Sequence, residues 1–181
     1  MTAAGEFCVS ETLKNGAAVT IRSLRASDRD KIASAIRQLD RDSIYTRLFS
    51  YRKELTEAGL DRIMTVDPER DVMLVVTVGA GAQEIIIASG RFVAAPGQGA
   101  VRSGEIAFMV EEDYQGQGIA GRLLRHLADV ARRKGVTAFE ADVLSENKSM
   151  LAVFARSGLP MRQRREGGIV HVTLSLSDPT V

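Results

Sequence analysis

The segment Ile106-Ala-Phe-Met-Val110 is followed by Glu111-Glu-Asp-Tyr114 and then by Gln115-Gly-Gln-Gly-Ile-Ala-Gly121, and it carries the strongest fold signal in the chain. An apolar run leads through an acidic turn into a glycine-rich loop. Apolar residues then recur at helical spacing at positions 123, 124, 127, 128, 130 and 131. A loop that opens a helix in this way exposes backbone N–H groups at the positive end of the helix dipole, a surface that binds phosphate. We therefore expect a phosphate-bearing ligand on residues 115–121.

Three kinds of phosphate-binding loop are candidates for this segment. The loop of nucleotide hydrolases requires Gly-Lys-Ser or Gly-Lys-Thr, and it is excluded because Arg122 follows Gly121. The dinucleotide pattern G-x-G-x-x-G is matched by Gly116, Gly118 and Gly121. That pattern should follow a buried strand almost at once, whereas residues 111–115 intervene here. Dinucleotide binding is therefore kept as an alternative to the third kind of loop.

The third kind is a Q-x-x-G-x-A loop, which residues 115–120 match. It closely resembles the acyl-coenzyme A pyrophosphate loop of the GNAT superfamily of N-acetyltransferases. Residues 105–110 resemble the fourth strand of that family, and residues 147–159 resemble its N-x-x-[AM]-x-x-x-[YF]-x-x-x-G-[FL] helix. The resemblance covers about residues 17–176, and locally it is closest to the acetyltransferase domain of bacterial Pat-type protein lysine acetyltransferases.

The composition indicates one soluble globular domain of 181 residues, with 45% hydrophobic and 26% charged residues. The 24 basic residues nearly balance the 23 acidic ones, which does not favour a nucleic-acid partner. No apolar run is long enough for a membrane span, and the N-terminus has no signal-peptide pattern. Because Cys8 is the single cysteine, no internal disulfide can form, and we expect a reducing cytoplasm. The oligomeric state stays open, a homodimer included.

Hydrophobic periodicity predicts an α+β fold in the order β-α-α-α-β-β-β-α-β-α-β. We expect strands over 17–24, 72–78, 84–94, 106–110, 137–144 and 169–176, helices over 29–39, 44–49, 56–66, 119–134 and 147–157, and a further short strand over 161–165. Residues 1–16 are expected to form a loose N-terminal arm, 17–176 one domain and 177–181 a tail. The GNAT resemblance implies a mixed, mostly antiparallel sheet with helices on both faces and a V-shaped splay between the strands near 110 and 143.

The same resemblance implies an acetyl-coenzyme A site. Its pantetheine arm would lie against the backbone of the splayed strand like an added strand, and Asn147 would hold the arm or cap its own helix. Gln115 would contact the ligand or only brace the loop. The residues expected at the coenzyme are Phe108, Met109, Val110, Gln115, Gly116, Gln117, Gly118, Ile119, Ala120, Gly121, Arg122, Asn147 and Phe154.

Transfer to an amine requires a proton acceptor, because a lysine amine with a pKa of roughly 10.4 is protonated near pH 7. The resemblance to Pat-type enzymes implies that Glu105 is this general base; the alternative is a solvated carboxylate at a strand end. Many relatives have a tyrosine as general acid where this chain has Phe154, which has no proton to donate. Neither His126 nor His171 has a metal-ligand or triad partner in the sequence, so we expect both at the surface and no metal site.

The acceptor is the least determined part of the function. Residues 42–49 resemble the S-x-Y-x-R-F-F segment that precedes the substrate lip of Pat-type enzymes, with Leu48 in place of an aromatic residue. This resemblance implies that Tyr45 and Arg47 contact the acceptor, and it favours a protein lysine. A small-molecule amine or amino acid is the first alternative, and a non-catalytic acyl-coenzyme A-binding module is the second. The sequence leaves open whether other acyl groups are used.

Overall fold

Eight strands form one sheet, in the spatial order β1-β2-β3-β4-β5-β6-β8-β7, in the computed structural model, which describes residues 6–37, 57–65, 67–96 and 101–177. All neighbouring strands pair antiparallel except β5 and β6, which pair in parallel. The strands are β1 Cys8–Thr12, β2 Ala18–Ser23, β3 Asp71–Val78, β4 Ile85–Ala94, β5 Ser103–Val110, β6 Ala138–Leu144, β7 Met161–Glu166 and β8 Ile169–Ser175.

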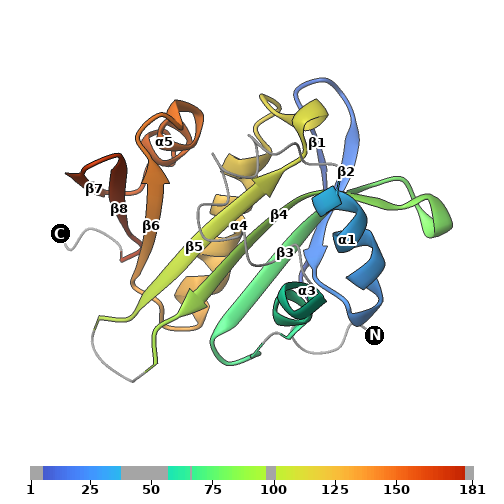
Figure 1. Ribbon diagram of the computed structural model, residues 1–181, viewed down its shortest axis with the longest axis horizontal. Coiled ribbons are helices and arrows are strands. Elements are labelled where there is room, and N and C mark those ends of the chain that lie inside the picture. The colour runs from blue at the N-terminus through green and yellow to red at the C-terminus, as the bar shows by residue number, and fades with distance from the viewer. Residues whose placement is uncertain (1–5, 38–56, 66, 97–100, 178–181) are drawn as a thin grey trace.

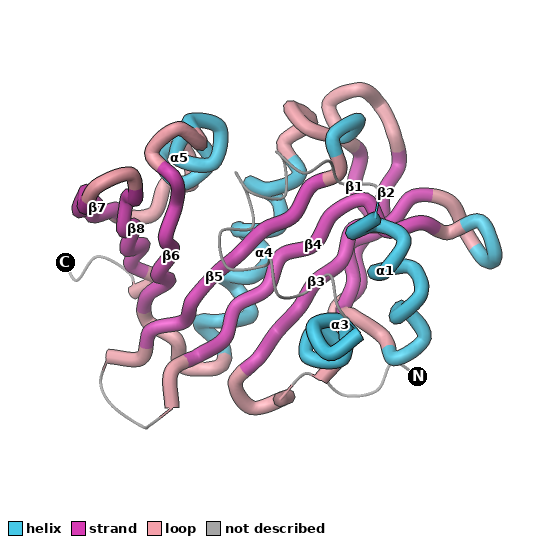
Figure 2. Tube along the Cα trace, viewed as in Figure 1, coloured by secondary structure: helices cyan, strands magenta, loops and turns pink. Residues whose placement is uncertain are grey.

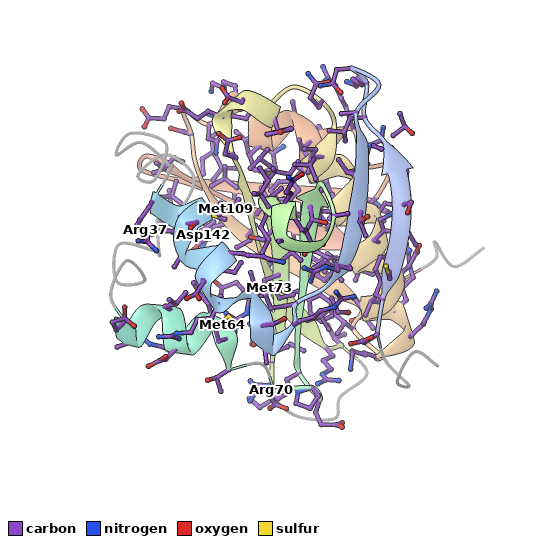
Figure 3. The ribbon with its side chains drawn as sticks, turned by 90° about the vertical axis from the view of Figure 1, so that its right-hand side faces the viewer. Arg37, Met64, Arg70, Met73, Met109 and Asp142 are labelled. Carbon is purple, nitrogen blue, oxygen red and sulfur yellow. The ribbon has the colours of Figure 1, made fainter. Side chains whose placement is uncertain are left out.

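Helices cover both faces of this sheet (Figures 1 and 2). Helices α1 Arg29–Arg37 and α3 Glu57–Met64 lie on one face, and α4 Ile119–Arg133 crosses the other, with α5 Lys148–Ala155 packed beside it. The α4 helix buries its apolar stripe in the larger core cluster, through residues such as Leu123, Leu124 and Leu127. A second cluster beneath α1 and α3 contains three methionines, Met64, Met73 and Met109, labelled in Figure 3.

The strands β5 and β6 separate part-way along their length. Their pairing is limited to Ser103–Glu105 opposite Ala138–Glu140, with Glu105 opposite Glu140 as the last pair. Both strands continue, to Val110 and Leu144, without pairing to each other over these described residues, and they diverge in Figure 1. Beyond this pair, the two strands therefore do not satisfy each other's inner-edge backbone groups. The predicted fold class and the V-shaped splay are confirmed.

The expectation of a loose arm over residues 1–16 is wrong for residues 8–12. Strand β1 pairs with β2 through all five of its residues, for example Val9 opposite Ile21. Its half-buried residues are Val9 and Glu11, so a carboxylate occupies a position where an apolar side chain would have revealed the strand. The limits of 17 and 176 for the domain stay a prediction. The predicted helix over 44–49, with Tyr45 and Arg47, and the tail from 178 lie outside the described residues.

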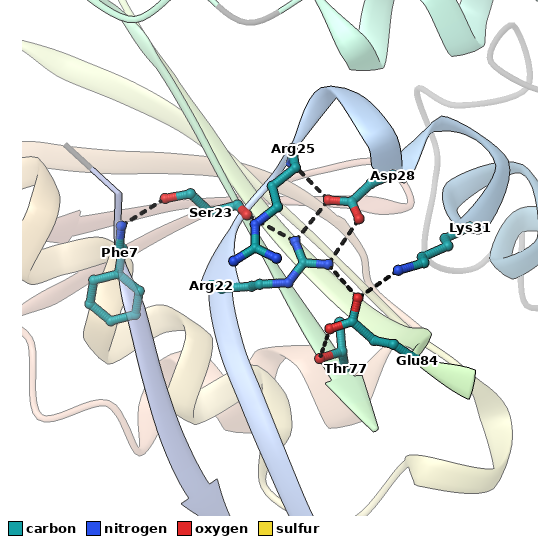
Figure 4. A network of polar contacts seen from close by, with 8 residues as sticks. All are labelled: Phe7, Arg22, Ser23, Arg25, Asp28, Lys31, Thr77 and Glu84. Carbon is teal, nitrogen blue, oxygen red and sulfur yellow. Dashed lines mark hydrogen bonds and ion pairs between the residues drawn. The ribbon is translucent and has the colours of Figure 1, made fainter. Parts of the chain in front are cut away.

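A buried ion-pair network joins β2 to the start of α1 and to the β3–β4 connection (Figure 4). The guanidinium of Arg22 donates to both carboxylate oxygens of Asp28 at 2.8 Å, and these side chains are 2% and 1% exposed. Arg22 also bonds Glu84 at 2.8 Å, and the ammonium of Lys31 reaches the same carboxylate oxygen at 2.6 Å. Hydrogen bonds from Arg22 and Lys31 lower the pKa of Glu84 to about 2. The network thereby holds α1 against the sheet.

We expect Asp28→Ala to lower the free energy of unfolding by about 3–5 kcal/mol, because it leaves the buried Arg22 guanidinium without its two-pronged partner. Urea unfolding followed by circular dichroism measures this loss. Asp61→Ala is the control, since Asp61 pairs with Arg29 on the surface, where its side chain is 67% exposed. A loss for Asp28→Ala no larger than that for Asp61→Ala would contradict the role of the network.

Candidate active site

The glycine-rich loop is shaped by two residues in the left-handed region. Gly116 has φ +75° and Gly118 has φ +82°, values that glycine adopts without the steric cost of a Cβ atom. Gly118 is the N-cap of α4, whose first turn carries no acidic side chain. The amide of Gln115 donates to the carbonyl oxygen of Val110 at 3.3 Å, so it braces the loop against the end of β5. Unpaired N–H groups of the first turn are thus presented together at the positive end of the helix dipole.

A cavity of about 800 Å³ opens beside this loop, between α4, strand β5 and helix α5. Its volume is within the range of small-molecule sites in proteins, roughly 300–1,000 Å³. Ten of the thirteen residues expected at the coenzyme line it: Phe108, Val110, Gln115, Gly116, Gly118, Ile119, Ala120, Gly121, Arg122 and Asn147. The glycine loop and the two motifs flanking it therefore meet at one cavity.

The other three expected coenzyme residues do not line the cavity. The side chain of Met109 packs in the cluster beneath α1 and α3, on the opposite face of the sheet. Phe154 is 1% exposed and packs in the core, with its ring centroid 6.2 Å from that of Phe108. The amide oxygen of Gln117 accepts the backbone N–H of Asn15 at 3.1 Å. Asn147 has a structural contact as well, since its side chain caps α5 by accepting the N–H of Met150 at 3.2 Å.

Four basic residues outside the set expected at the coenzyme also line the cavity: Lys14, Arg125, Arg132 and Arg156. One signal for Arg125 was available, because it lies three residues after Arg122 on the same helix and so shares its face. No local pattern marks Lys14, which arrives from the β1–β2 hairpin, about a hundred residues away along the chain. The cavity is therefore more cationic than the glycine loop alone suggested.

Glu105 lies at the point where β5 and β6 part. It is exposed, and by strand alternation it faces the same side as Met109, whereas Phe108 faces the cavity on the α4 side. Its neighbour across the strand pair is Glu140, which is exposed as well. A group entering the splay from the cavity would therefore reach the other face of the sheet beside Glu105.

A profile of the Acetyltransferase (GNAT) family matches residues 35–159 of this chain. The chain belongs to this family of acetyltransferases. It is 31% identical over 140 residues to the acetyltransferase PA5475 of Pseudomonas aeruginosa, covering 77% of this chain and 74% of that protein. It is 33% identical over 138 residues to the acetyltransferase Pat of Mycolicibacterium smegmatis, covering 76% of this chain but only 40% of that longer protein.

Among solved structures, the GNAT domain of the S. lividans PAT superposes with a TM-score of 0.82 and 28% identity. The alignment covers 93% of this chain and 96% of that domain. The GNAT resemblance drawn from the loop and helix motifs, and the local likeness to Pat-type enzymes, are therefore confirmed at the level of family and fold.

Both histidines of this acetyltransferase have a carboxylate partner that the sequence did not reveal. His171 Nδ1 bonds Asp142 across the β6–β8 pair, on the face that carries Glu105. His126 Nε2 lies 2.5 Å from a carboxylate oxygen of Glu11, which links α4 to β1. The partners escaped notice because each lies on a different strand or helix, 29 and 115 residues away.

Among the described residues, no group of three or more histidine, cysteine, aspartate or glutamate side chains comes together as a metal site. Within the same ranges, no helix has both the length and the apolar character needed to cross a membrane.

Close to the cavity, burial raises the pKa of Glu111, directly after β5, and the charge of Asp113 raises it further.

Proposed function

We propose that this acetyltransferase moves an acetyl group from acetyl-coenzyme A to a primary amine by direct attack. The observation that carries the proposal is the cavity of about 800 Å³, which runs from the glycine loop to β5, the strand that begins to splay at Glu105. The loop offers N–H groups to a diphosphate, and the part of β5 that does not pair with β6 offers backbone partners to the amides of a pantetheine arm. This is the ligand that the two motifs of the family predict.

The expected coenzyme residues divide into two sets. Gln115 to Arg122 would surround the diphosphate, while the backbone near Met109 and Val110 would bond the arm, which explains why the Met109 side chain can point away from the cavity. Asn147 would contribute less directly, by capping α5 and so fixing the far wall of the cavity. A cytoplasmic location stays a prediction from the lone Cys8.

Glu105 would act as the proton acceptor at the apex of the splay. The acceptor arrives as an ammonium group, and Glu105 takes one proton from it, directly or through a water molecule. The neutral nitrogen attacks the thioester carbonyl, a C–N bond forms, the C–S bond breaks, and the sulfur leaves with the electron pair. The new amide loses its surplus proton to solvent or to the departing thiolate. Because Phe154 has no proton to donate and is buried, the thiolate would leave without a general acid from this position.

We propose a protein lysine as the acceptor. The support is the likeness to two Pat acetyltransferases and the exposed carboxylates Glu105, Glu140 and Asp142 on the face away from the cavity, which suit a cationic amine. The resemblance of residues 42–49 to the segment before the Pat-type substrate lip adds to it. A small cationic amine would interact with the same carboxylates, so a small-molecule acceptor stays the alternative.

Incubation of a cell lysate with the enzyme and isotope-labelled acetyl-coenzyme A, followed by mass spectrometry of peptides and metabolites, tests the acceptor. We expect label on lysine side chains of proteins, above a control reaction that lacks the enzyme. Label confined to small metabolites would show that the acceptor is a small amine and not a protein lysine. Release of free thiol no faster than hydrolysis, with every amine and lysate supplied, would favour the non-catalytic binding module.

A further inference from the structure

The hairpin between β1 and β2 packs against the glycine loop and the start of α4. Leu13, at its turn, is 3% exposed and belongs to the same apolar cluster as α4. The backbone N–H of Asn15 donates to the side-chain oxygen of Gln117 at 3.1 Å, which joins the hairpin turn to the loop itself. Directly before β1, the ring centroid of Phe7 lies 5.0 Å from that of His126. The hairpin is thus a wall beside the cavity.

Glu11 fastens this wall to α4 through three side chains. Its carboxylate accepts hydrogen bonds from Arg122 at 2.6 Å and Arg125 at 2.9 Å and lies 2.5 Å from His126 Nε2. Burial alone would raise the pKa of Glu11, but the bonds from His126 and Arg122 outweigh it and hold that pKa below its usual range. Arg122 lines the cavity, yet it already forms an ion pair with Glu11, so it is a weaker candidate for a phosphate contact than its position suggests.

Lys14 is placed differently. It lines the cavity, and its Cε atom is 3.5 Å from the position that a Cβ atom on Gly118 would take, at the N-cap of α4. An ammonium group there is next to the positive end of the helix dipole, an unfavourable arrangement for a cation alone. A doubly charged anion between the ammonium and the loop N–H groups would attract both of them. The repulsion between the cation and the helix end would thereby be replaced by two favourable interactions. Cavity, cation and N–H groups thus converge on one anion position.

We propose that Lys14 binds the diphosphate of the coenzyme, so that the N-terminal hairpin completes a site which the glycine loop forms only in part. This inference rests on the proposed acetyl-coenzyme A site and adds to it the residue that supplies the positive charge. Glu11 is a positioning residue, because it holds the hairpin on α4 and keeps Lys14 over the loop.

Isothermal titration of the full chain at low ionic strength tests the proposal, with coenzyme A and 3′-dephospho-coenzyme A as probes. For Lys14→Met we expect the dissociation constants of both to rise by about 10-fold, because a charge-assisted contact to the shared diphosphate is lost. Lys14→Arg should restore most of the affinity. Lys134→Met is the matched control, since Lys134 is at the opposite end of α4 and bonds the carbonyl oxygen of Pro68; its affinities should stay within about 2-fold.

The two probes separate the outcomes. A loss for coenzyme A alone, with dephospho-coenzyme A unaffected, would move Lys14 to the 3′-phosphate and overturn the diphosphate assignment. Unchanged affinity for both probes would remove Lys14 from the site altogether. Failure of the unmodified protein to bind coenzyme A is a different result, because it would reject the proposed function on which this inference rests.

Discussion

The variant Gly118→Glu should lose coenzyme A binding almost completely, with a dissociation constant raised by at least about 100-fold. Its carboxylate would occupy the anion position at the N-cap of α4, where it would accept the hydrogen bonds of the loop N–H groups in place of the diphosphate. A side chain attached here begins 3.5 Å from Lys14 Cε, so the glutamate would also pair with the proposed phosphate cation. A phosphate group would then meet a like charge. Isothermal titration with coenzyme A measures the loss.

Backbone strain must be separated from this charge effect, because Gly118 has φ +82° and any other residue is strained there. Gly118→Ala imposes the strain without the carboxylate and should bind with only a modest loss. Gly135→Glu places the same residue at φ +76° in open space beyond the other end of α4, and it should bind normally. Binding by Gly118→Glu as tight as that by Gly135→Glu would show that the coenzyme does not use this loop.

The parts of the fold that were predictable from sequence are those whose signals are local. The amphipathic stripe of α4, the glycines before it and the asparagine that caps α5 each mark an element within a few residues. Strand β1 was missed because its inward side chains are Val9 and Glu11, and a strand with a single inward apolar residue has no readable period. Its stability comes from pairing with β2 and from ion pairs to α4, neither of which is local.

The candidate site divides in the same way. The loop residues were identified from spacing and from resemblance, and most of them line one cavity. Lys14 was missed because its place beside Gly118 depends on how the hairpin packs on α4. The carboxylate partners of His126 and His171 were missed for the same reason, since each comes from another strand. Tyr45 and Arg47 lie outside the described residues, so their contact with the acceptor stays a prediction.

Replacing the proposed base should affect the rate and not the binding of coenzyme. We expect Glu105→Gln to lower kcat by about 10²- to 10³-fold, because the amide keeps the shape of the side chain but cannot accept a proton. The dissociation constant for coenzyme A should be unchanged, since Glu105 faces away from the cavity. Glu140→Gln is the matched control: Glu140 is the partner of Glu105 across β5 and β6, is exposed on the same face and carries the same charge.

One side-by-side measurement tests whether Glu105 is the proton acceptor in acetyl transfer. Thiol release from acetyl-coenzyme A, with the acceptor found by mass spectrometry at saturating concentration, is followed for the unmodified enzyme, Glu105→Gln and Glu140→Gln. We predict a rate for Glu105→Gln at least about 100-fold below the unmodified enzyme and a rate for Glu140→Gln within about 3-fold of it. Near-normal turnover by Glu105→Gln would show that Glu105 is not the proton acceptor. A large loss of rate in Glu140→Gln alone would assign that role to Glu140 on β6.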